Sequence, residues 1–216
     1  FVATRGRHYM SGMQAIAKLP ILMRDLDQAR GLETGGFISG YRGSPLGGYD
    51  QALKRVSGHL RARRIELVEG INEEIAATSV WGAQQVCLFA DREVEGVFGI
   101  WYGKGPGVDR SGDAIKHANM AGSSSLGGVL CLAGDDHACK SSTLPHQSEL
   151  NLRDMNVPTL VPGNVRELLE LGILGLELSR YSGCWVGMKV TSLTIDSSCS
   201  VNFDDLSLQA CLPSQE

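Results

Sequence analysis

The stretch Ile65-Glu-Leu-Val-Glu-Gly-Ile-Asn-Glu-Glu-Ile-Ala-Ala77 carries the pattern that decides the fold: a short strand, a turn and the start of a helix. Its first residues form a short apolar run, rich in branched side chains, that is typical of a buried strand. The chain turns at Gly70, and Asn72 is a favourable N-cap for a helix. Glu73 and Glu74 then fall in the first helical turn, where the helix dipole favours negative charge. The two carboxylates are therefore either ordinary helix-start residues or, at the carboxyl end of a strand, part of a site.

The same alternation of strand and helix continues along the chain. Apolar or glycine-rich runs predict six strands, at residues 36–41, 65–69, 96–102, 127–134, 158–161 and 185–190. Helices are predicted at 11–30, 50–60, 73–89, 114–121 and 164–180, with a kink or break at Pro20. Near-continuous apolar strands that alternate with helices predict a three-layer α/β fold. It has an open, mainly parallel six-stranded sheet with helices on both faces.

Composition limits the kind of protein. The 216 residues suit one α/β domain, which we place at residues 1–195, and residues 196–216 read as a polar, Ser-rich tail or linker toward a downstream domain. A net charge of −4 argues against nucleic-acid binding. No apolar run approaches the roughly 20 residues of a membrane helix. The six cysteines form no CxxC pair and no iron–sulfur spacing, so we expect a reduced, cytoplasmic protein.

Four unusual loops follow the carboxyl ends of strands. Besides the turn before Glu73, they are the glycine-rich segments 42–50 and 103–112 and the long polar segment 135–149. In open α/β sheets ligands bind at that edge. The glycine spacing fits neither a P-loop nor a dinucleotide fingerprint, and no nucleophile elbow is present. The His, Cys and Asp residues of 135–149 match no common zinc spacing, so no metal site is predicted. The residue patterns alone leave the ligand open.

Four of these segments closely resemble the large fused form of the indolepyruvate:ferredoxin oxidoreductase family, which belongs to the thiamine-diphosphate-dependent 2-oxoacid:ferredoxin oxidoreductases. The resemblance rests on Ser39-Gly-Tyr-Arg-Gly-Ser-Pro-Leu-Gly-Gly-Tyr-Asp50, Asn72-Glu-Glu-Ile-Ala-Ala77, Trp101-Tyr-Gly-Lys-Gly-Pro-Gly-Val-Asp-Arg-Ser-Gly-Asp113 and Ala133-Gly-Asp-Asp-His-Ala-Cys-Lys-Ser-Ser-Thr-Leu-Pro-His-Gln-Ser-Glu149. It extends to about Val201 and identifies the chain as resembling the amino-terminal pyrimidine-binding domain of such an enzyme.

The resemblance implies an activity and its partners. Enzymes of this family oxidatively decarboxylate a 2-oxoacid, here indolepyruvate or another aryl pyruvate, to acyl-CoA and CO2 and reduce ferredoxin. Thiamine diphosphate binds between the pyrimidine domain and a separate diphosphate-binding domain, and self-association into a homo-oligomer is expected. A glutamate of the pyrimidine domain hydrogen-bonds N1′ of the aminopyrimidine and favours its imino tautomer, a role that suits a carboxyl group in an apolar cleft.

The resemblance also assigns roles to residues. Glu73 aligns with the cofactor-activating glutamate, and Glu74 remains the alternative because register in a first helical turn is uncertain by one residue. The other expected cofactor contacts are Lys104, Gly105, Pro106 and Gly107. The expected substrate contacts are Tyr41, Arg42, Ser44, Asp136, His137 and Lys140. Arg42 stands where the family has a proline, so the loop backbone need not follow the family's path.

Two family features are missing from the chain. It lacks the Gly-Asp-Gly motif, with its later Asn, that holds the diphosphate and Mg2+, and it lacks the cysteines of the [4Fe-4S] clusters. We therefore expect Mg2+ and clusters to bind elsewhere in a full-length enzyme, and the chain alone to be inactive. Two alternatives stay open: a domain of a non-redox thiamine-dependent 2-oxoacid decarboxylase, or a non-catalytic α/β interaction domain.

Overall fold

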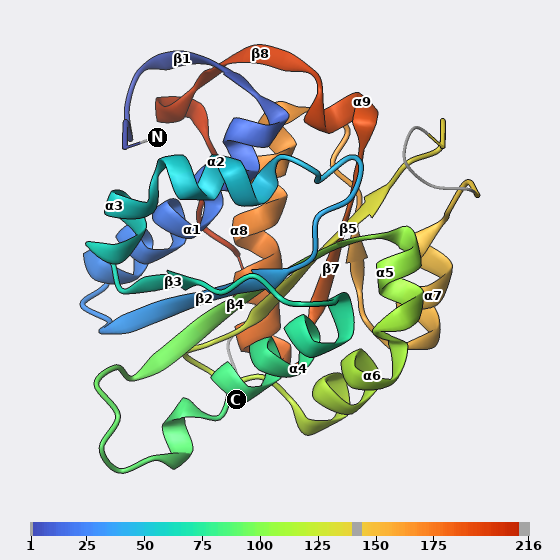
Figure 1. Cartoon of the computed structure of the whole chain (residues 1–216). Coiled ribbons are helices and arrows are strands. Elements are labelled where there is room, and N and C mark those ends of the chain that lie inside the picture. Colours follow the sequence, from blue (N-terminus) through green and yellow to red (C-terminus); the bar gives the residue numbers. More distant parts are fainter. Residues whose placement is uncertain (1, 140–143, 212–216) are drawn as a thin grey trace.

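A computed structural model of the chain describes residues 2–139 and 144–211. The central strands are β2 (Thr34–Gly40), β3 (Ile65–Leu67), β4 (Gly96–Lys104), β5 (Val129–Asp135), β6 (Thr159–Leu160) and β7 (Val186–Thr191). They form one parallel six-stranded sheet in the order β3-β2-β4-β5-β7-β6. All six predicted strands are present, so the predicted three-layer α/β fold is confirmed (Figure 1).

The helices cover both faces of this sheet. They are α1 (Gly12–Ala29), α2 (Tyr49–Arg55), α3 (Ser57–Arg61), α4 (Glu73–Ala83), α5 (Gly105–Arg110), α6 (Gly112–Ala121), α7 (Ser148–Asp154), α8 (Val165–Ser182) and α9 (Ser192–Ile195), with a 3-10 turn η1 (Val86–Leu88). Helices α1 and α8 pack together on one face, and α4 and α6 pack together on the other (Figure 1). No helix in the described residues is both long and apolar enough to cross a membrane.

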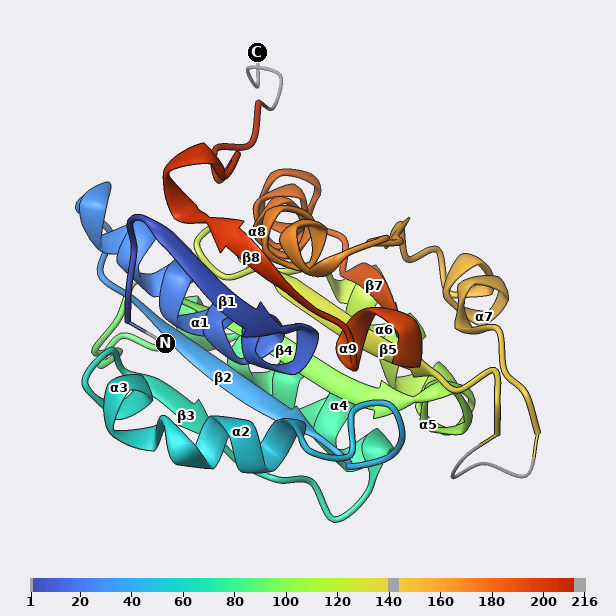
Figure 2. The same cartoon turned by 90° about the horizontal axis from the view of Figure 1, so that it is seen from above.

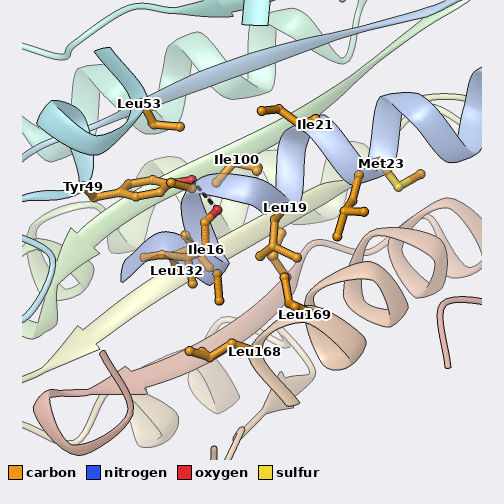
Figure 3. Close-up of a cluster of buried hydrophobic side chains, with 14 of the residues drawn as sticks. Ile16, Leu19, Ile21, Met23, Tyr49, Leu53, Ile100, Leu132, Leu168 and Leu169 are labelled. Carbon is orange, nitrogen blue, oxygen red and sulfur yellow. Dashed lines mark hydrogen bonds between the residues drawn. The ribbon is translucent and has the colours of Figure 1, made fainter. Parts of the chain in front are cut away.

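Alternation along the central strands produces two cores. In β4, Ile100 and Tyr102 belong to the core shared with α1 and α8, whereas Trp101 belongs to the core shared with α4 and α6. Because side chains alternate between the faces of a strand, such fully apolar runs are what a sheet buried on both faces requires. Figure 3 shows the first core, with Ile16 and Leu19 of α1 facing Leu168 and Leu169 of α8.

The sequence predicts a kink or a break at Pro20, and helix α1 is continuous through this residue, so there is no break. Its predicted start is confirmed, because Ser11 caps the helix with a capping box. Proline has no N–H to donate to the carbonyl four residues earlier, which here is that of Ile16. The hydroxyl of Tyr49 donates a hydrogen bond to this carbonyl over 3.5 Å (Figure 3). A neighbouring element thus provides the partner that Pro20 cannot.

A second, two-stranded antiparallel sheet joins the two ends of the described chain. Strand β1 (Arg7–Ser11) pairs with β8 (Ser198–Asn202), which continues into a 3-10 turn, η2 (Phe203–Asp205) (Figure 2). Each strand buries one residue, Met10 or Val201. Residues 198–205 are therefore held against the domain, and the boundary drawn at residue 195 stays a prediction.

Candidate functional site

The carboxyl ends of β2, β4 and β5 lie level with one another. Gly40 is opposite Tyr102, and Lys104 is opposite Gly134, so the loops that follow these strands start at the same edge. The segment after β3 reaches the same edge, because Gly70 N–H donates a hydrogen bond to the carbonyl of Gly40 over 3.1 Å. The topology therefore brings the four unusual loops of the sequence to one edge.

Glu73 is the first residue of α4, and its carboxyl group is enclosed. Asn72 caps the helix by accepting a hydrogen bond from Ile75 N–H over 2.8 Å. Glu73 is only 8% exposed, whereas Glu74 points to solvent. The main-chain carbonyl of Glu73 accepts a hydrogen bond from Nε1 of the buried Trp101 over 3.0 Å. Of the two candidate glutamates, Glu73 is thus the one that the fold buries and fixes.

The first turn of α5 faces this carboxyl group. A Cβ atom at Gly107 would lie 2.6 Å from Cγ and 2.8 Å from Oε1 of Glu73, so only glycine leaves the side chain its present place. Gly107 is buried and Pro106 is exposed. We expected a loop in this glycine-rich segment, and the structure has a helix, in which proline is favourable near the start.

The predicted substrate loop after β2 lies against the same turn. Tyr41 N–H donates to the carbonyl of Tyr102 over 3.0 Å, while the side chains of Tyr41 and Arg42 are exposed. A Cβ at Gly43 would lie 2.6 Å from Cδ of Lys104, so this loop and the start of α5 touch. Ser44 is half-buried and precedes a cis peptide bond to Pro45. The structure thus brings the segments of Tyr41, Arg42 and Ser44 together with the predicted cofactor segment.

A charged cluster that the sequence did not reveal flanks this loop. Lys54 donates to Glu69 over 2.7 Å, and this bond, with a hydrogen bond shared with the buried Asp50, holds the pKa of Glu69 below its usual range. Burial raises the pKa of Tyr102, and the carboxylates of Asp50 and Glu69 raise it further, against the opposing charge of Arg42. Asp50 and Glu69 sit at helix and strand ends, where acidic residues are common, so nothing in the sequence separates them from ordinary surface charges.

The loop after β5 is only partly a loop. Asp136 is 2% exposed, His137 is exposed, and Lys140 lies outside the described residues. From Ser148 the segment forms α7, where we expected irregular structure, and α7 lies next to α5 (Figure 1). No residue pattern in the chain predicts that Asp136 is buried and His137 exposed.

Buried Asp135 anchors the end of this segment. Its two carboxylate oxygens accept hydrogen bonds from N–H (2.9 Å) and Oγ (2.5 Å) of Ser148, and Lys189 Nζ lies 3.5 Å away. Lys189 also pairs with Glu149 at 2.8 Å; burial would raise the pKa of Glu149, but this ammonium prevails and lowers it. Nowhere in the described chain do three or more metal-binding side chains gather in a group that could hold a metal ion.

Comparison with known proteins establishes the fold. No protein-family model and no curated protein sequence matches the chain. Among solved structures, it resembles a 2-oxoglutarate:ferredoxin oxidoreductase from Magnetococcus marinus with 2-oxoglutarate, coenzyme A and succinyl-CoA bound. The TM-score is 0.69 at 19% sequence identity, over 94% of this chain and 33% of that protein. The chain thus shares its architecture with one third of a larger 2-oxoacid oxidoreductase.

Proposed function

We propose that this chain is the pyrimidine-binding domain of a thiamine-diphosphate-dependent 2-oxoacid:ferredoxin oxidoreductase. The observation that carries the proposal is the buried carboxyl group of Glu73, held at the carboxyl edge of the sheet against Gly107. The shared fold and the four sequence segments support it. A carboxyl group that is shielded from water there can share a proton with a ring nitrogen more strongly than an exposed one.

The residues present fit the aminopyrimidine half of the cofactor. Glu73 would hold the proton at N1′, and Gly107 lies beside that carboxyl group without a side chain that would crowd it. Gly105 and the exposed Pro106 precede Gly107 in the same turn of α5. When bound, thiamine diphosphate supplies the nucleophilic carbon and the electron sink that decarboxylation needs. The diphosphate and Mg2+ would be held by another domain of the same enzyme.

The loop after β2 would receive the substrate. The exposed guanidinium of Arg42 can make a bidentate, charge-assisted pair with a carboxylate, and the hydroxyl of Ser44 can donate a hydrogen bond. Lys104, Asp136 and His137 border the same edge. We propose a 2-oxoacid as the substrate, CoA as the acyl acceptor and ferredoxin as the electron acceptor. The choice of indolepyruvate or another aryl pyruvate rests on the sequence resemblance alone.

Paired glutamine substitutions in the full-length enzyme test this function. Glu73→Gln keeps size and polarity but cannot exchange the proton, so we expect turnover to fall by about 100-fold or more, with unchanged far-UV circular dichroism. Glu74→Gln is the matched control, one residue away and exposed, and should keep near-normal turnover. The opposite pattern would move the role to Glu74. Normal activity in both variants, or turnover that does not depend on thiamine diphosphate, would overturn the proposal.

A substrate comparison tests the finer assignment. The ratio kcat/KM for indolepyruvate, pyruvate and 2-oxoglutarate, measured with CoA and ferredoxin, should be highest for indolepyruvate. Preference for either of the other acids would correct the substrate and leave the enzyme class intact. Product release as an aldehyde without ferredoxin reduction would instead indicate a non-redox decarboxylase.

A further inference from the structure

The imidazole of His146 lies between two carboxylates from different elements, and the function proposed above does not use it. Its Nε2 is 2.8 Å from Oδ2 of Asp109 in α5, and its Nδ1 is 3.8 Å from Oδ1 of Asp135 at the end of β5. The His146 side chain is 15% exposed and Asp135 is fully buried. The ring therefore bonds to α5 through Nε2, whereas Nδ1 makes no hydrogen bond within the described residues and faces the carboxylate at the end of β5.

The ring of His146 is tightly packed, and the two carboxylates beside it are themselves held in place. A Cβ atom at Gly105 would lie 2.3 Å from Cγ and Nδ1 of His146, so the ring occupies the space beside the first residue of α5. Asp135 is fixed by Ser148, as described above, and Asp109 also accepts a hydrogen bond from Asn151 of α7. The ring thus packs against the first residue of α5 while its carboxylate partners are held by α7.

The same turn of α5 borders the proposed cofactor-activating group. Gly107, two residues after Gly105, faces Cγ and Oε1 of Glu73, so the place of α5 sets the space that the carboxyl group has. Through Gly105 and Gly107, His146 and Glu73 lie against the same short helix. A displacement of α5 of a few tenths of an ångström would change the position of Glu73.

We propose that His146 is a positioning residue, which holds α5 against β5 and thereby fixes the carboxyl group of Glu73 in the place where it acts on the aminopyrimidine. This inference rests on the proposed function. It predicts that loss of the imidazole misplaces the carboxyl group of Glu73. Such a misplacement lowers kcat more than it weakens the binding of the substrate.

The test compares histidine variants of the full-length enzyme at a temperature where circular dichroism shows each to be folded. His146→Ala should lower kcat by about 10-fold or more and leave KM for the 2-oxoacid within about 2-fold. His146→Gln, whose amide can still donate to Asp109, should restore most of kcat. His117→Ala is the matched control: His117 is exposed and pairs with Asp113 at 3.5 Å on α6.

A readout without activity separates positioning from general stability. Hydrogen exchange of the backbone amides of α5 should accelerate in His146→Ala, and not in His117→Ala. A Cβ at position 105 collides with the ring, so Gly105→Ala should lower kcat in wild type but have little further effect in the His146→Ala background.

Each outcome decides the matter. Unchanged kcat in folded His146→Ala, or failure of glutamine to rescue a lowered kcat, would overturn the positioning role while wild-type activity keeps the proposed function. Wild-type enzyme without thiamine-diphosphate-dependent turnover would overturn both.

Discussion

Trp101 Nε1 donates a hydrogen bond to the main-chain carbonyl of Glu73 over 3.0 Å, which ties the centre of the sheet to the first residue of α4. The indole is fully buried, so no water can replace this donor. The bond fixes the backbone from which the proposed cofactor-activating side chain extends. It belongs to the core packed under α4 and α6.

Trp101→Phe should therefore affect both stability and the site. It removes the donor and leaves a carbonyl that has lost a partner, which we expect to cost about 1–3 kcal/mol in the free energy of unfolding beyond the change in ring size. Thiamine-diphosphate affinity of the full-length enzyme should fall as well, because the start of α4 is less firmly held. Urea unfolding and a cofactor titration measure the two effects.

Trp185→Phe is the matched control. Trp185 is fully buried in the same core, but its Nε1 has no hydrogen-bond partner within the described residues. Its substitution loses ring contacts and no hydrogen bond, so it should cost less stability than Trp101→Phe and leave cofactor affinity unchanged. Equal effects of the two substitutions would show that the bond to Glu73 has no particular importance.

Gly107→Ala should lower activity without unfolding the protein. The new Cβ would lie within 3.0 Å of three atoms of the Glu73 side chain, whose flexible end can move away at small cost. We expect near wild-type stability and a loss of turnover approaching that of Glu73→Gln. Gly82→Ala in α4 is the control, since a Cβ there meets nothing within 4 Å and alanine favours the helix by about 0.5–1 kcal/mol. Full activity of Gly107→Ala would show that Glu73 can act from another position.

The fold was more predictable from the sequence than the site. Strands β4 and β5 are buried on both faces and therefore consist of continuous apolar runs, which can be recognised from the local sequence alone. Strands β1 and β8 bury one residue each and depend on a partner some 190 positions away in the chain, which no local pattern contains. Helix α5 was hidden by its glycines, which the close approach of Glu73 and His146 requires and which normally indicate a loop.

Of the candidate site, the sequence predicted only that several loops lie at one edge of the sheet. Strand order and register bring the segments of Tyr41, Glu73 and Lys104 together, as a parallel sheet must. The choice between Glu73 and Glu74 depends on the register of α4. Sequence periodicity leaves this register ambiguous by one residue, whereas the structure buries Glu73 and exposes Glu74. Asp109 and His146 are 37 positions apart, so their pairing is a tertiary fact.

Breaking a buried ion pair between α1 and α8 should be costly to the stability of the other core. Arg180 makes two hydrogen bonds, of 2.7 and 2.8 Å, to the fully buried Asp27, which also accepts one from Thr34. Asp27→Asn leaves the guanidinium with Glu177, 3.6 Å away, as its remaining counter-charge. We therefore expect a loss at the lower end of the range for a broken buried pair, about 3 kcal/mol in the free energy of unfolding.

Asp154→Asn provides the comparison for this pair. It breaks the exposed pair of Asp154 with Lys116 and should change the free energy of unfolding by less than about 1 kcal/mol. Chemical denaturation of the two variants measures the difference. A similar small cost for both would mean that Glu177 and water compensate the charge of Arg180 in the Asp27→Asn variant.

Lys18 should make the free energy of unfolding rise with pH in the alkaline range. Burial lowers its pKa from 10.5 to about 8, opposed by the charge of Asp25 and assisted by that of Arg63. Between these two pH values the unfolded chain binds more protons than the folded one, so the contribution of Lys18 to stability rises with pH in this window and is constant below it. Lys18→Met removes the titrating group. The free energy of unfolding of wild type minus that of Lys18→Met should therefore increase from about pH 8 to pH 10.5, by an amount on the order of 1–3 kcal/mol.

Loss of the hydrogen bond from Nζ to the carbonyl of Ala3 (2.5 Å) and of the contact with the Phe203 ring shifts this difference by a constant offset, whereas its slope with pH comes from the ammonium of Lys18. Urea unfolding of both proteins at several pH values gives the slope, and a flat difference would show that the Lys18 ammonium keeps its ordinary pKa in the folded chain.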